Sequence, residues 1–196
     1  MSAEAPTIDE LLAGGDVKAC CAAAYEHPLI RWLLGGELHP GGEATTRRSL
    51  ELLGVGPGER LLDVASGSGA SALLAARERG CEVVGVDYGE GAVAGARAAA
   101  AAISPPSAVE FVVGDAESLP FGAEFDAVLC ECSLCTFPDK ERAVAEIRRV
   151  LRVGGRLAIC DVVADRARLP ARLDGTLATV ACVGEALDDA GYRRLL

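Results

Sequence analysis

The sequence has no apolar run close to the roughly 18 residues that a membrane-spanning helix requires. Its N-terminus, Met1 to Pro6, is acidic where a secretory signal peptide would be basic. Basic residues are also few: 19 Lys and Arg stand against 29 Asp and Glu, and the net charge of −10 disfavours nucleic acid and anionic membranes as partners. These absences predict a cytoplasmic protein whose partners are small or neutral molecules.

Hydrophobic residues make up 51% of the 196 positions, which is enough for one globular domain with a full core and argues against disorder. Eight cysteines are present. In a reducing compartment they are expected to be free thiols. Their number can then reflect metal binding, catalysis or simple core packing.

Apolar runs of strand length alternate with helical patterns along most of the chain. Such alternation is typical of right-handed crossovers and a parallel sheet with helices on both faces. We predict a single α/β domain over 1–196, with a helical N-terminal cap (1–42), a core (43–165) and a helical C-terminal segment (166–196). The predicted strands are 60–66, 82–87, 109–113, 125–131 and 156–162, and the predicted helices of the core are 43–53, 70–79, 90–102 and 139–151.

Two glycines one residue apart, Gly67 and Gly69, follow the first predicted strand and precede a helix. Glycines let backbone amides come close to a ligand, and the positive end of the helix points to the same place. An acid lies at or near the end of each of the first three strands: Asp63, Asp87 and Asp115. Because the carboxyl ends of parallel strands meet at one edge of a sheet, these acids predict one shared ligand crevice.

Two classes of cofactor fit this loop. Gly67, Gly69 and Ala72, with Asp87 at a spacing of twenty residues from Gly67, satisfy the dinucleotide fingerprint, in which the acid binds the adenosine ribose. Asp63 argues against a dinucleotide, because its carboxylate would repel a pyrophosphate but attract an ammonium group. The charges therefore favour a ligand with a cationic group.

The same residues resemble the class I S-adenosylmethionine-dependent methyltransferases, whose D-x-x-x-G-x-G loop matches Asp63 to Gly69. A second block, Gly114 to Phe121 followed by Phe125 to Val128, is also similar to that family. The resemblance covers about residues 40–165 and implies a Rossmann-like parallel sheet of about five strands in the order 3-2-1-4-5. It implies helices on both faces and S-adenosylmethionine as the cofactor. The sequence shows no clear final strand pair, so we expect the pair that is usual in this family to be missing and the sheet to stop at five strands.

The resemblance also assigns the parts of the cofactor to residues. It places the methionine moiety against Asp63 and the glycine loop, the ribose hydroxyls on Asp87, and the adenine against Tyr88, Asp115 and Ala116. A carboxylate can accept from two vicinal hydroxyls, and an adenine needs a polar contact at its amino edge and an apolar slot. The predicted cofactor-binding residues are Asp63, Ser66, Gly67, Ser68, Gly69, Asp87, Tyr88, Asp115, Ala116 and Glu131.

Cysteines occur in three separated parts of the chain: Cys20 and Cys21, then Cys132 and Cys135, and finally Cys182. Only folding could bring them together. Cys132 is predicted at the carboxyl end of the fourth strand, where open α/β sheets bind ligands. Soft thiolates suit a soft, thiophilic acceptor.

These segments resemble the arsenite S-adenosylmethionine methyltransferases. Cys132, which is followed by Pro138-Asp139-Lys140, and Cys182, in the pattern Cys-x-Gly-x-Ala-Leu, match cysteine blocks of that family, and Cys20 or Cys21 corresponds loosely to its first cysteine. The resemblance implies that these four cysteines are catalytic and bind trivalent arsenic as ligands. Glutathione or another thiol would then be a partner, because thiols carry arsenic in the cell.

The sequence departs from the arsenite family in several places. The Tyr-Gly-Cys-Gly element is not visible, Glu131 stands where the family has asparagine, Cys135 is additional, and the chain ends before the family's C-terminal domain. Methyl transfer to an oxygen or nitrogen atom would need a base to take up the proton of that atom. An arsenic lone pair carries no proton, so methyl transfer to arsenic needs no base. Glu131 or a histidine is the candidate for that role.

Several cysteines also fit a purely structural role. Cys81, Cys130 and Cys160 are expected to be buried in strands, because cysteine often packs as a small hydrophobe. A zinc site at Cys132-x-x-Cys135 is disfavoured, since the sequence has no second C-x-x-C, and Tyr25 is expected mainly to pack. The rival functions are a small-molecule O-, N- or S-methyltransferase with structural cysteines, a non-catalytic metalloid-binding protein and a nicotinamide oxidoreductase.

Overall fold

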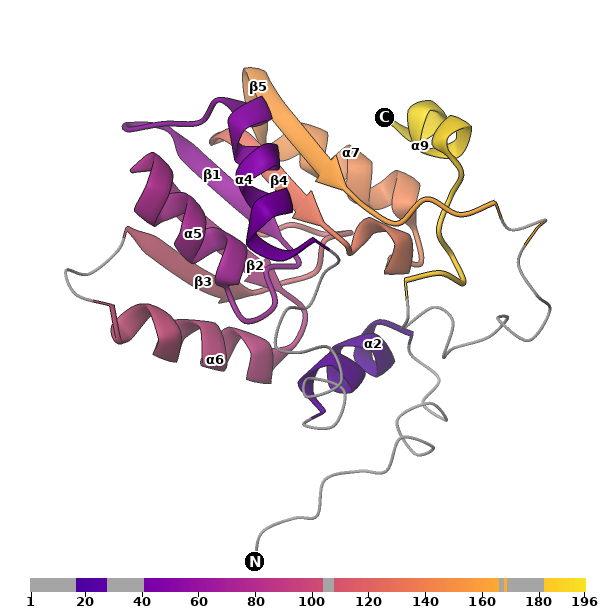
Figure 1. Ribbon diagram of the computed structural model, residues 1–196, viewed down its shortest axis with the longest axis horizontal. Helices are drawn as coiled ribbons and strands as arrows, with labels where there is room; N and C mark the ends of the chain where they lie inside the picture. The colour runs from indigo at the N-terminus through magenta and orange to yellow at the C-terminus, as the bar shows by residue number, and fades with distance from the viewer. Residues whose placement is uncertain (1–16, 28–40, 104–107, 166–167, 169–181) are drawn as a thin grey trace, which may run out of the picture.

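The computed structural model describes residues 17–27, 41–103, 108–165, 168 and 182–196. Five parallel strands form one sheet in the order β3-β2-β1-β4-β5 (Figure 1). This is the predicted order. The strands are β1 (Arg60–Val64), β2 (Glu82–Asp87), β3 (Val109–Val113), β4 (Phe125–Glu131) and β5 (Leu151–Cys160); the helices are α2 (Val17–Glu26), α4 (Gly42–Leu53), α5 (Ala70–Arg79), α6 (Glu90–Ala101), η1 (Leu134–Thr136), α7 (Lys140–Val150) and α9 (Asp189–Leu195).

Helices cover both faces of the sheet, because the strands are apolar on both sides (Figure 1). In β1, Leu61 points to a core shared with α4, α5 and α6, whereas Leu62 and Val64 point to a core shared with α7 and α9. All three side chains are fully buried. The alternation along one strand therefore produces a three-layer domain with the sheet in the middle.

Two strand boundaries differ from the prediction. β1 ends at Val64 rather than at residue 66, because Ala65 has a φ of 57° and turns the chain out of the strand. β5 spans Leu151–Cys160 rather than 156–162, and it begins directly where α7 ends. The side chain of Asp161 accepts a hydrogen bond from the Cys135 amide (2.9 Å), which ties the end of β5 to the loop after β4.

Parts of the predicted termini lie outside the described residues. Of the helical cap over 1–42, the structure describes α2 and residues 27, 41 and 42. Of the segment over 166–196, it describes residue 168 and residues 182–196, with α9 as their helix.

The prediction that Cys160 is buried is wrong, because this side chain is half-buried, whereas Cys81 and Cys130 are buried as expected. None of the helices in the described ranges is long and apolar enough to cross a membrane.

Phe125 at the start of β4 offers a test of the core. It is fully buried, it packs edge-on against Phe121 with ring centroids 5.2 Å apart, and the Arg60 guanidinium lies 5.2 Å from its ring. We expect Phe125→Ala to lower the free energy of unfolding by about 3–5 kcal/mol in urea titrations, since it leaves a cavity in a packed core. The exposed Val153→Ala should change it by less than about 0.5 kcal/mol, and equal effects of the two variants would contradict the packing described here.

Candidate active site

The loop between β1 and α5 brings its backbone into the site by adopting left-handed conformations. Gly67 and Gly69 have φ values of 52° and 84°, which glycine tolerates. A Cβ at Gly69 would lie 2.5 Å from the Phe111 ring, so this position has no room for another residue type. The Ser66 amide donates to the Val86 carbonyl (3.0 Å), and this bond fixes the loop against β2.

A cavity of about 290 Å³ opens at the carboxyl ends of the strands, between this loop, α2, α4 and the segment that follows β4. All of the predicted cofactor-binding residues line it except Gly69, which packs behind the loop. The sequence prediction missed other lining residues, which come from helices or from the loop after β4 and carry no local motif. They include Lys18, Tyr25, Thr46, Ser71 and Phe137.

Asp63 is the most unusual residue of the cavity. Its side chain is 3% exposed, and in the described part of the protein its Oδ2 has no hydrogen-bond partner, nor has the Ser66 hydroxyl. Burial, followed by the negative charges of Glu131 and Asp87, raises the pKa of Asp63 well above its ordinary value. A cationic donor such as an ammonium group would fill this position, so the residues present fit a ligand that carries one.

Asp87 at the end of β2 is held by backbone amides. Its two carboxylate oxygens accept from the Gly67 amide (2.7 Å) and the Gly89 amide (2.8 Å). A carboxylate has lone pairs for further donors, so Asp87 can also accept from vicinal hydroxyls. Tyr88 follows it and presents a 41% exposed ring at the cavity.

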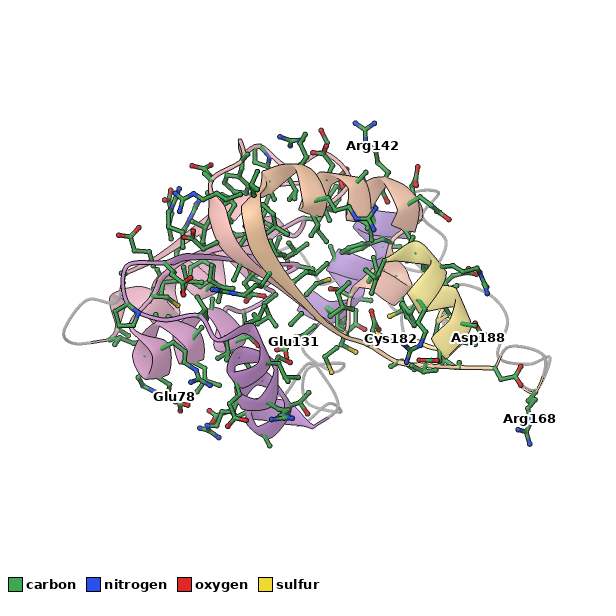
Figure 2. All side chains as sticks on the ribbon, turned by 90° about the horizontal axis from the view of Figure 1, so that it is seen from above. Glu78, Glu131, Arg142, Arg168, Cys182 and Asp188 are labelled. Atoms are coloured by element: carbon green, nitrogen blue, oxygen red, sulfur yellow. The ribbon has the colours of Figure 1, made fainter. Side chains whose placement is uncertain are left out.

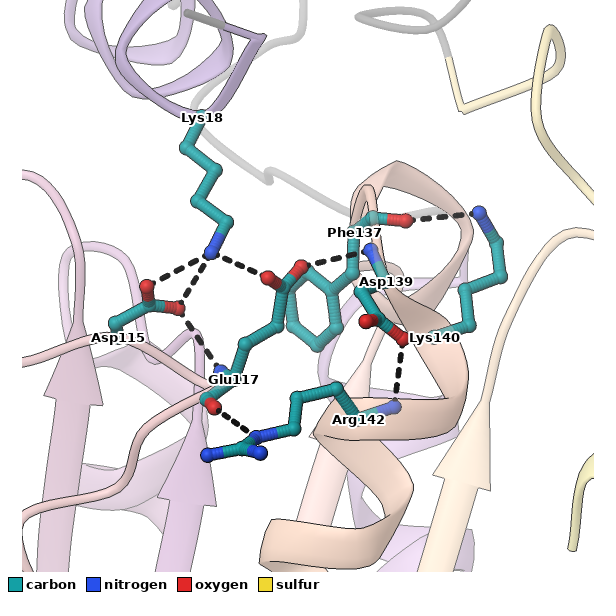
Figure 3. A network of polar contacts seen from close by, with 7 residues as sticks. All are labelled: Lys18, Asp115, Glu117, Phe137, Asp139, Lys140 and Arg142. Atoms are coloured by element: carbon teal, nitrogen blue, oxygen red, sulfur yellow. Dashed lines mark hydrogen bonds and ion pairs between the residues drawn. The ribbon is translucent and has the colours of Figure 1, made fainter.

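Asp115 is paired with a lysine from the N-terminal helix. Lys18 Nζ lies 2.7 and 3.0 Å from the Asp115 carboxylate oxygens and 2.6 Å from Glu117 Oε2 (Figure 3). Burial opposes the charge of Lys18, but its hydrogen bonds to the two acids outweigh burial and raise its pKa. Glu117 also accepts from the Asp139 amide (2.8 Å), so this network joins α2, the cavity rim and the start of α7 (Figure 3).

Glu131 at the end of β4 accepts three hydrogen bonds from hydroxyl groups. Ser49 Oγ lies 3.0 Å from Oε1, and Thr46 Oγ1 and Ser71 Oγ lie 2.9 and 2.8 Å from Oε2. Two of the donors come from α4 and one from α5. The carboxylate is therefore fixed at the cavity wall by two helices.

The fold brings together cysteines that are 50 residues apart in the sequence. The Sγ atoms of Cys132 and Cys182 lie 3.6 Å apart, and the Tyr25 hydroxyl lies 3.1 Å from Cys182 Sγ. Cys135 is buried against Cys182. Cys132 and Cys182 both have positive φ, 50° and 60°, a strained conformation for residues with a side chain.

The four cysteines predicted as ligands are not all at the same point. Cys21 and Cys132 line the cavity, Cys182 lies behind Cys132, and Cys20 is buried away from the cavity. All eight cysteines are free thiols. In the described ranges, no group of three or more His, Cys, Asp or Glu side chains is arranged to hold a metal ion.

The thiol cluster favours one shared negative charge. Hydrogen bonds from Cys132, Cys135 and Tyr25 lower the pKa of Cys182 well below its ordinary value, even though burial opposes the charge. The pKa values of Cys132 and Cys135 are raised, first by their bonds to Cys182 and then by burial. Within the cluster, Cys182 is thus the thiol that its neighbours make most acidic, and it lies with Glu131 at the end of the sheet where the strands terminate (Figure 2).

Comparison with known proteins matches residues 62–159 to a family described as "Methyltransferase domain". The O-methyltransferase cnsE of Penicillium expansum is 35% identical over 148 residues, which cover 68% of this chain and 54% of that protein. An arsenite methyltransferase of Halobacterium salinarum is 36% identical over 148 residues, covering 69% of this chain and 38% of that protein. The chain spans about half the length of the curated relatives it matches.

Among solved structures, the chain is similar to CrArsM, an arsenic(III) S-adenosylmethionine methyltransferase from Chlamydomonas reinhardtii. The two are 31% identical with a TM-score of 0.62, and the match covers 71% of this chain and 50% of that chain. These relatives differ in the group that they methylate, so the acceptor has to be argued from the site.

The buried Asp63 predicts an unusual dependence of stability on pH. Because its pKa is raised, the folded state binds more protons than the unfolded state between the ordinary carboxyl pKa, about 4, and the raised value. The stability of the ligand-free protein should therefore fall as pH rises through this range. We expect Asp63→Asn to be more stable than wild type by about 1 kcal/mol or more at neutral pH, measured by guanidinium unfolding.

Asp126 is the matched control, because the Arg60 amide and then Arg152 lower its pKa. The stability that it contributes is present above the ordinary carboxyl pKa and is lost as pH falls through the lowered value. Asp126→Asn should thus be less stable than wild type at neutral pH, and the difference should shrink in acid. If Asp63→Asn behaved in the same way, the raised pKa assigned to Asp63 would be wrong.

Proposed function

The chain belongs to the methyltransferase-domain family, and from that premise we propose that it methylates a trivalent metalloid, such as arsenite, held by cysteine thiolates. S-adenosylmethionine is the cofactor. When bound it supplies an electrophilic methyl group, which a lone pair of the acceptor receives while the carbon–sulfur bonding electrons stay on sulfur. The observation that carries the choice of acceptor is the 3.6 Å separation of Cys132 and Cys182 beside the cofactor cavity.

The cofactor residues have distinct roles in this proposal. Asp63, with its unpartnered oxygen, would hold the ammonium group, and Asp87 would accept from the ribose hydroxyls. Asp115 and Ala116 would contact the adenine, with Tyr88 beside it. The glycine loop would let its backbone approach the methionine moiety, so the chain's own contribution is mainly to position reactants in a partly water-free site.

The thiolates would bind and orient the metalloid. Each exchange with glutathione would form one arsenic–sulfur bond and break another. A cysteine that enters as the thiol would pass its proton to the departing glutathione. Cys182, whose pKa is lowered by its neighbours, would enter more readily as the thiolate, and the glutathione that it displaces would then take a proton from solvent. Cys132 would be the second ligand, and Cys21 would close on the pair from α2, because it lines the cavity and Cys20 does not. Three sulfur ligands would leave trivalent arsenic with a lone pair that can receive the methyl group.

The surroundings of Glu131 also favour a metalloid over an oxygen or nitrogen acceptor, which would require a base. Its oxygens accept from three hydroxyl groups, and none of the described cavity residues is a histidine. Glu131 is therefore better suited to a fixed charge than to proton transfer. A metalloid lone pair carries no proton, so this site can serve it without a base.

A second candidate is methyl transfer to an oxygen, nitrogen or sulfur atom of a small molecule, with structural cysteines. It is favoured by the similarity to an O-methyltransferase, which is as high as that to the arsenite enzyme. The apolar side chains at the cavity, such as Phe137 and Leu74, would suit an organic acceptor. Substitution of the clustered cysteines separates the two candidates.

We expect Cys132→Ser and Cys182→Ser each to lower formation of methylated arsenic from arsenite and glutathione by about two orders of magnitude, because a hydroxyl is a poor ligand for a thiophilic element. Mass spectrometry of the products measures the rate, and calorimetry with S-adenosylmethionine should show that both variants still bind the cofactor. Cys81→Ala is the control, since Cys81 is buried near Ala75 and far from the cluster in the fold.

Three outcomes distinguish the hypotheses. Full activity of either serine variant on arsenite would contradict the metalloid proposal. A wild-type protein that binds the cofactor but forms no methylated arsenic would favour a small-molecule acceptor. A protein that binds arsenite but no S-adenosylmethionine would be a metalloid binder rather than an enzyme.

Lys18 gives a separate prediction for the adenosine part of the cofactor. Lys18→Met should weaken binding of S-adenosylmethionine about three- to tenfold, because Asp115 loses its ion pair and α2 loses one tie to the cavity rim. Lys18→Arg should keep most of the affinity, since it retains the charge. Calorimetry on both variants checks this, and equal loss in both would mean that the charge of Lys18 does not position Asp115.

A further inference from the structure

We infer that Glu131 sets the preference of the site for cationic S-adenosylmethionine over S-adenosylhomocysteine, the product left after methyl transfer. The inference rests on the cofactor assignment and is independent of the methyl acceptor. It makes Glu131 a specificity-determining residue, and a general base is not part of its role.

Glu131 brings a negative charge to the cavity wall. Its three hydrogen-bond donors, Thr46, Ser49 and Ser71, are neutral hydroxyls. Hydroxyl donors satisfy the lone pairs of a carboxylate but do not cancel its charge. The negative charge of Glu131 also contributes to the raised pKa of Asp63, which lies on the adjacent strand β1 at the same edge of the sheet.

The other two acids, Asp87 and Asp63, act on groups that both ligands share. Asp87 is fixed by the Gly67 and Gly89 amides in a position suited to hydroxyls, and both ligands carry the same ribose. Asp63 is 3% exposed with an unpartnered oxygen in the cavity, and an ammonium group occurs in both ligands. We therefore expect neither acid to discriminate strongly between S-adenosylmethionine and S-adenosylhomocysteine.

The position of Glu131 in the chain places its charge near the reacting end of the cofactor. It directly precedes Cys132 at the end of β4, where the cavity meets the thiol cluster. The methyl group must face its acceptor, so the charged sulfur is the part of the cofactor that has to lie near this wall. The product has a neutral thioether there and keeps every other group. A fixed negative charge at this point attracts the cofactor more than the product.

This arrangement would favour turnover. The product loses the attraction of Glu131 at the moment of methyl transfer, because the positive charge disappears from the sulfur. Its affinity falls relative to that of the incoming cofactor, so exchange of the two is promoted without movement of the protein.

The test compares dissociation constants for three ligands by calorimetry. They are S-adenosylmethionine, S-adenosylhomocysteine, and sinefungin, an analogue with an amine in place of the sulfonium methyl group. We expect Glu131→Gln to weaken the two cationic ligands about tenfold relative to S-adenosylhomocysteine, because the amide keeps the shape and removes the charge. Enzyme turnover is not needed for this measurement.

Ser49→Ala is the matched control. It removes one hydrogen bond from Glu131 but keeps the charge, so it should change all three affinities by a similar factor. If Glu131→Gln also weakened all three ligands equally, its role would be only structural and the inference would be overturned. If Glu131→Gln binds none of the three ligands, Glu131→Asp is measured instead. A wild-type ratio of affinities in Glu131→Asp supports the inference, and loss of that ratio with binding retained overturns it.

The result does not depend on arsenic. If the protein did not methylate arsenite, the metalloid proposal would be wrong, but the ratio of the affinities for S-adenosylmethionine and S-adenosylhomocysteine would be unaffected. If that ratio stayed the same when the charge of Glu131 was removed, the inference would be wrong and the metalloid proposal would be unaffected.

Discussion

The buried carboxyl of Asp63, with one oxygen unpartnered among the described residues, is the feature on which the site depends. A buried acid with an unsatisfied oxygen destabilises the folded protein, so the surrounding sheet and helices must hold it in place. They do so because β1 is central in the sheet and packs on both faces. Under the proposed function, the ammonium group of the cofactor would remove this penalty on binding. Affinity for the cofactor and the stability of the free protein would therefore be opposed at one residue.

Strained backbone conformations are found at the same edge of the sheet. Ala65, Cys132 and Cys182 are the described non-glycine residues with positive φ, and each lies at the cavity or against a residue that lines it. Such conformations are unfavourable by about 1–2 kcal/mol each and persist only where packing determines them. Around the two cysteines this packing comes from a small cluster that includes Cys135, Ala186 and Tyr25, separate from the two cores on the faces of the sheet.

Local sequence was sufficient to predict five strands, apart from the ends of β1 and β5, and the glycine loop, because buried parallel strands read as continuous apolar runs. The order of the strands was implied by the resemblance to the methyltransferase family, and the structure confirms it. It could not predict the partners of Glu131 or the ion pair of Lys18, since these contacts join residues 60 to 99 positions apart. Cys135 shows the same limit. In the sequence it is only an additional cysteine, and its contact with Cys182 depends on how the C-terminal segment returns over the sheet.

Helix α2 contacts both halves of the site. Near its start, Lys18 binds Asp115 and Glu117 at the cavity rim, and near its end, Tyr25 contacts Cys182 of the thiol cluster. Under the proposed function, the cofactor and the acceptor would share this wall of ten residues. A displacement of the helix would then open both sites together, so the protein would enclose the donor and the acceptor as one compartment.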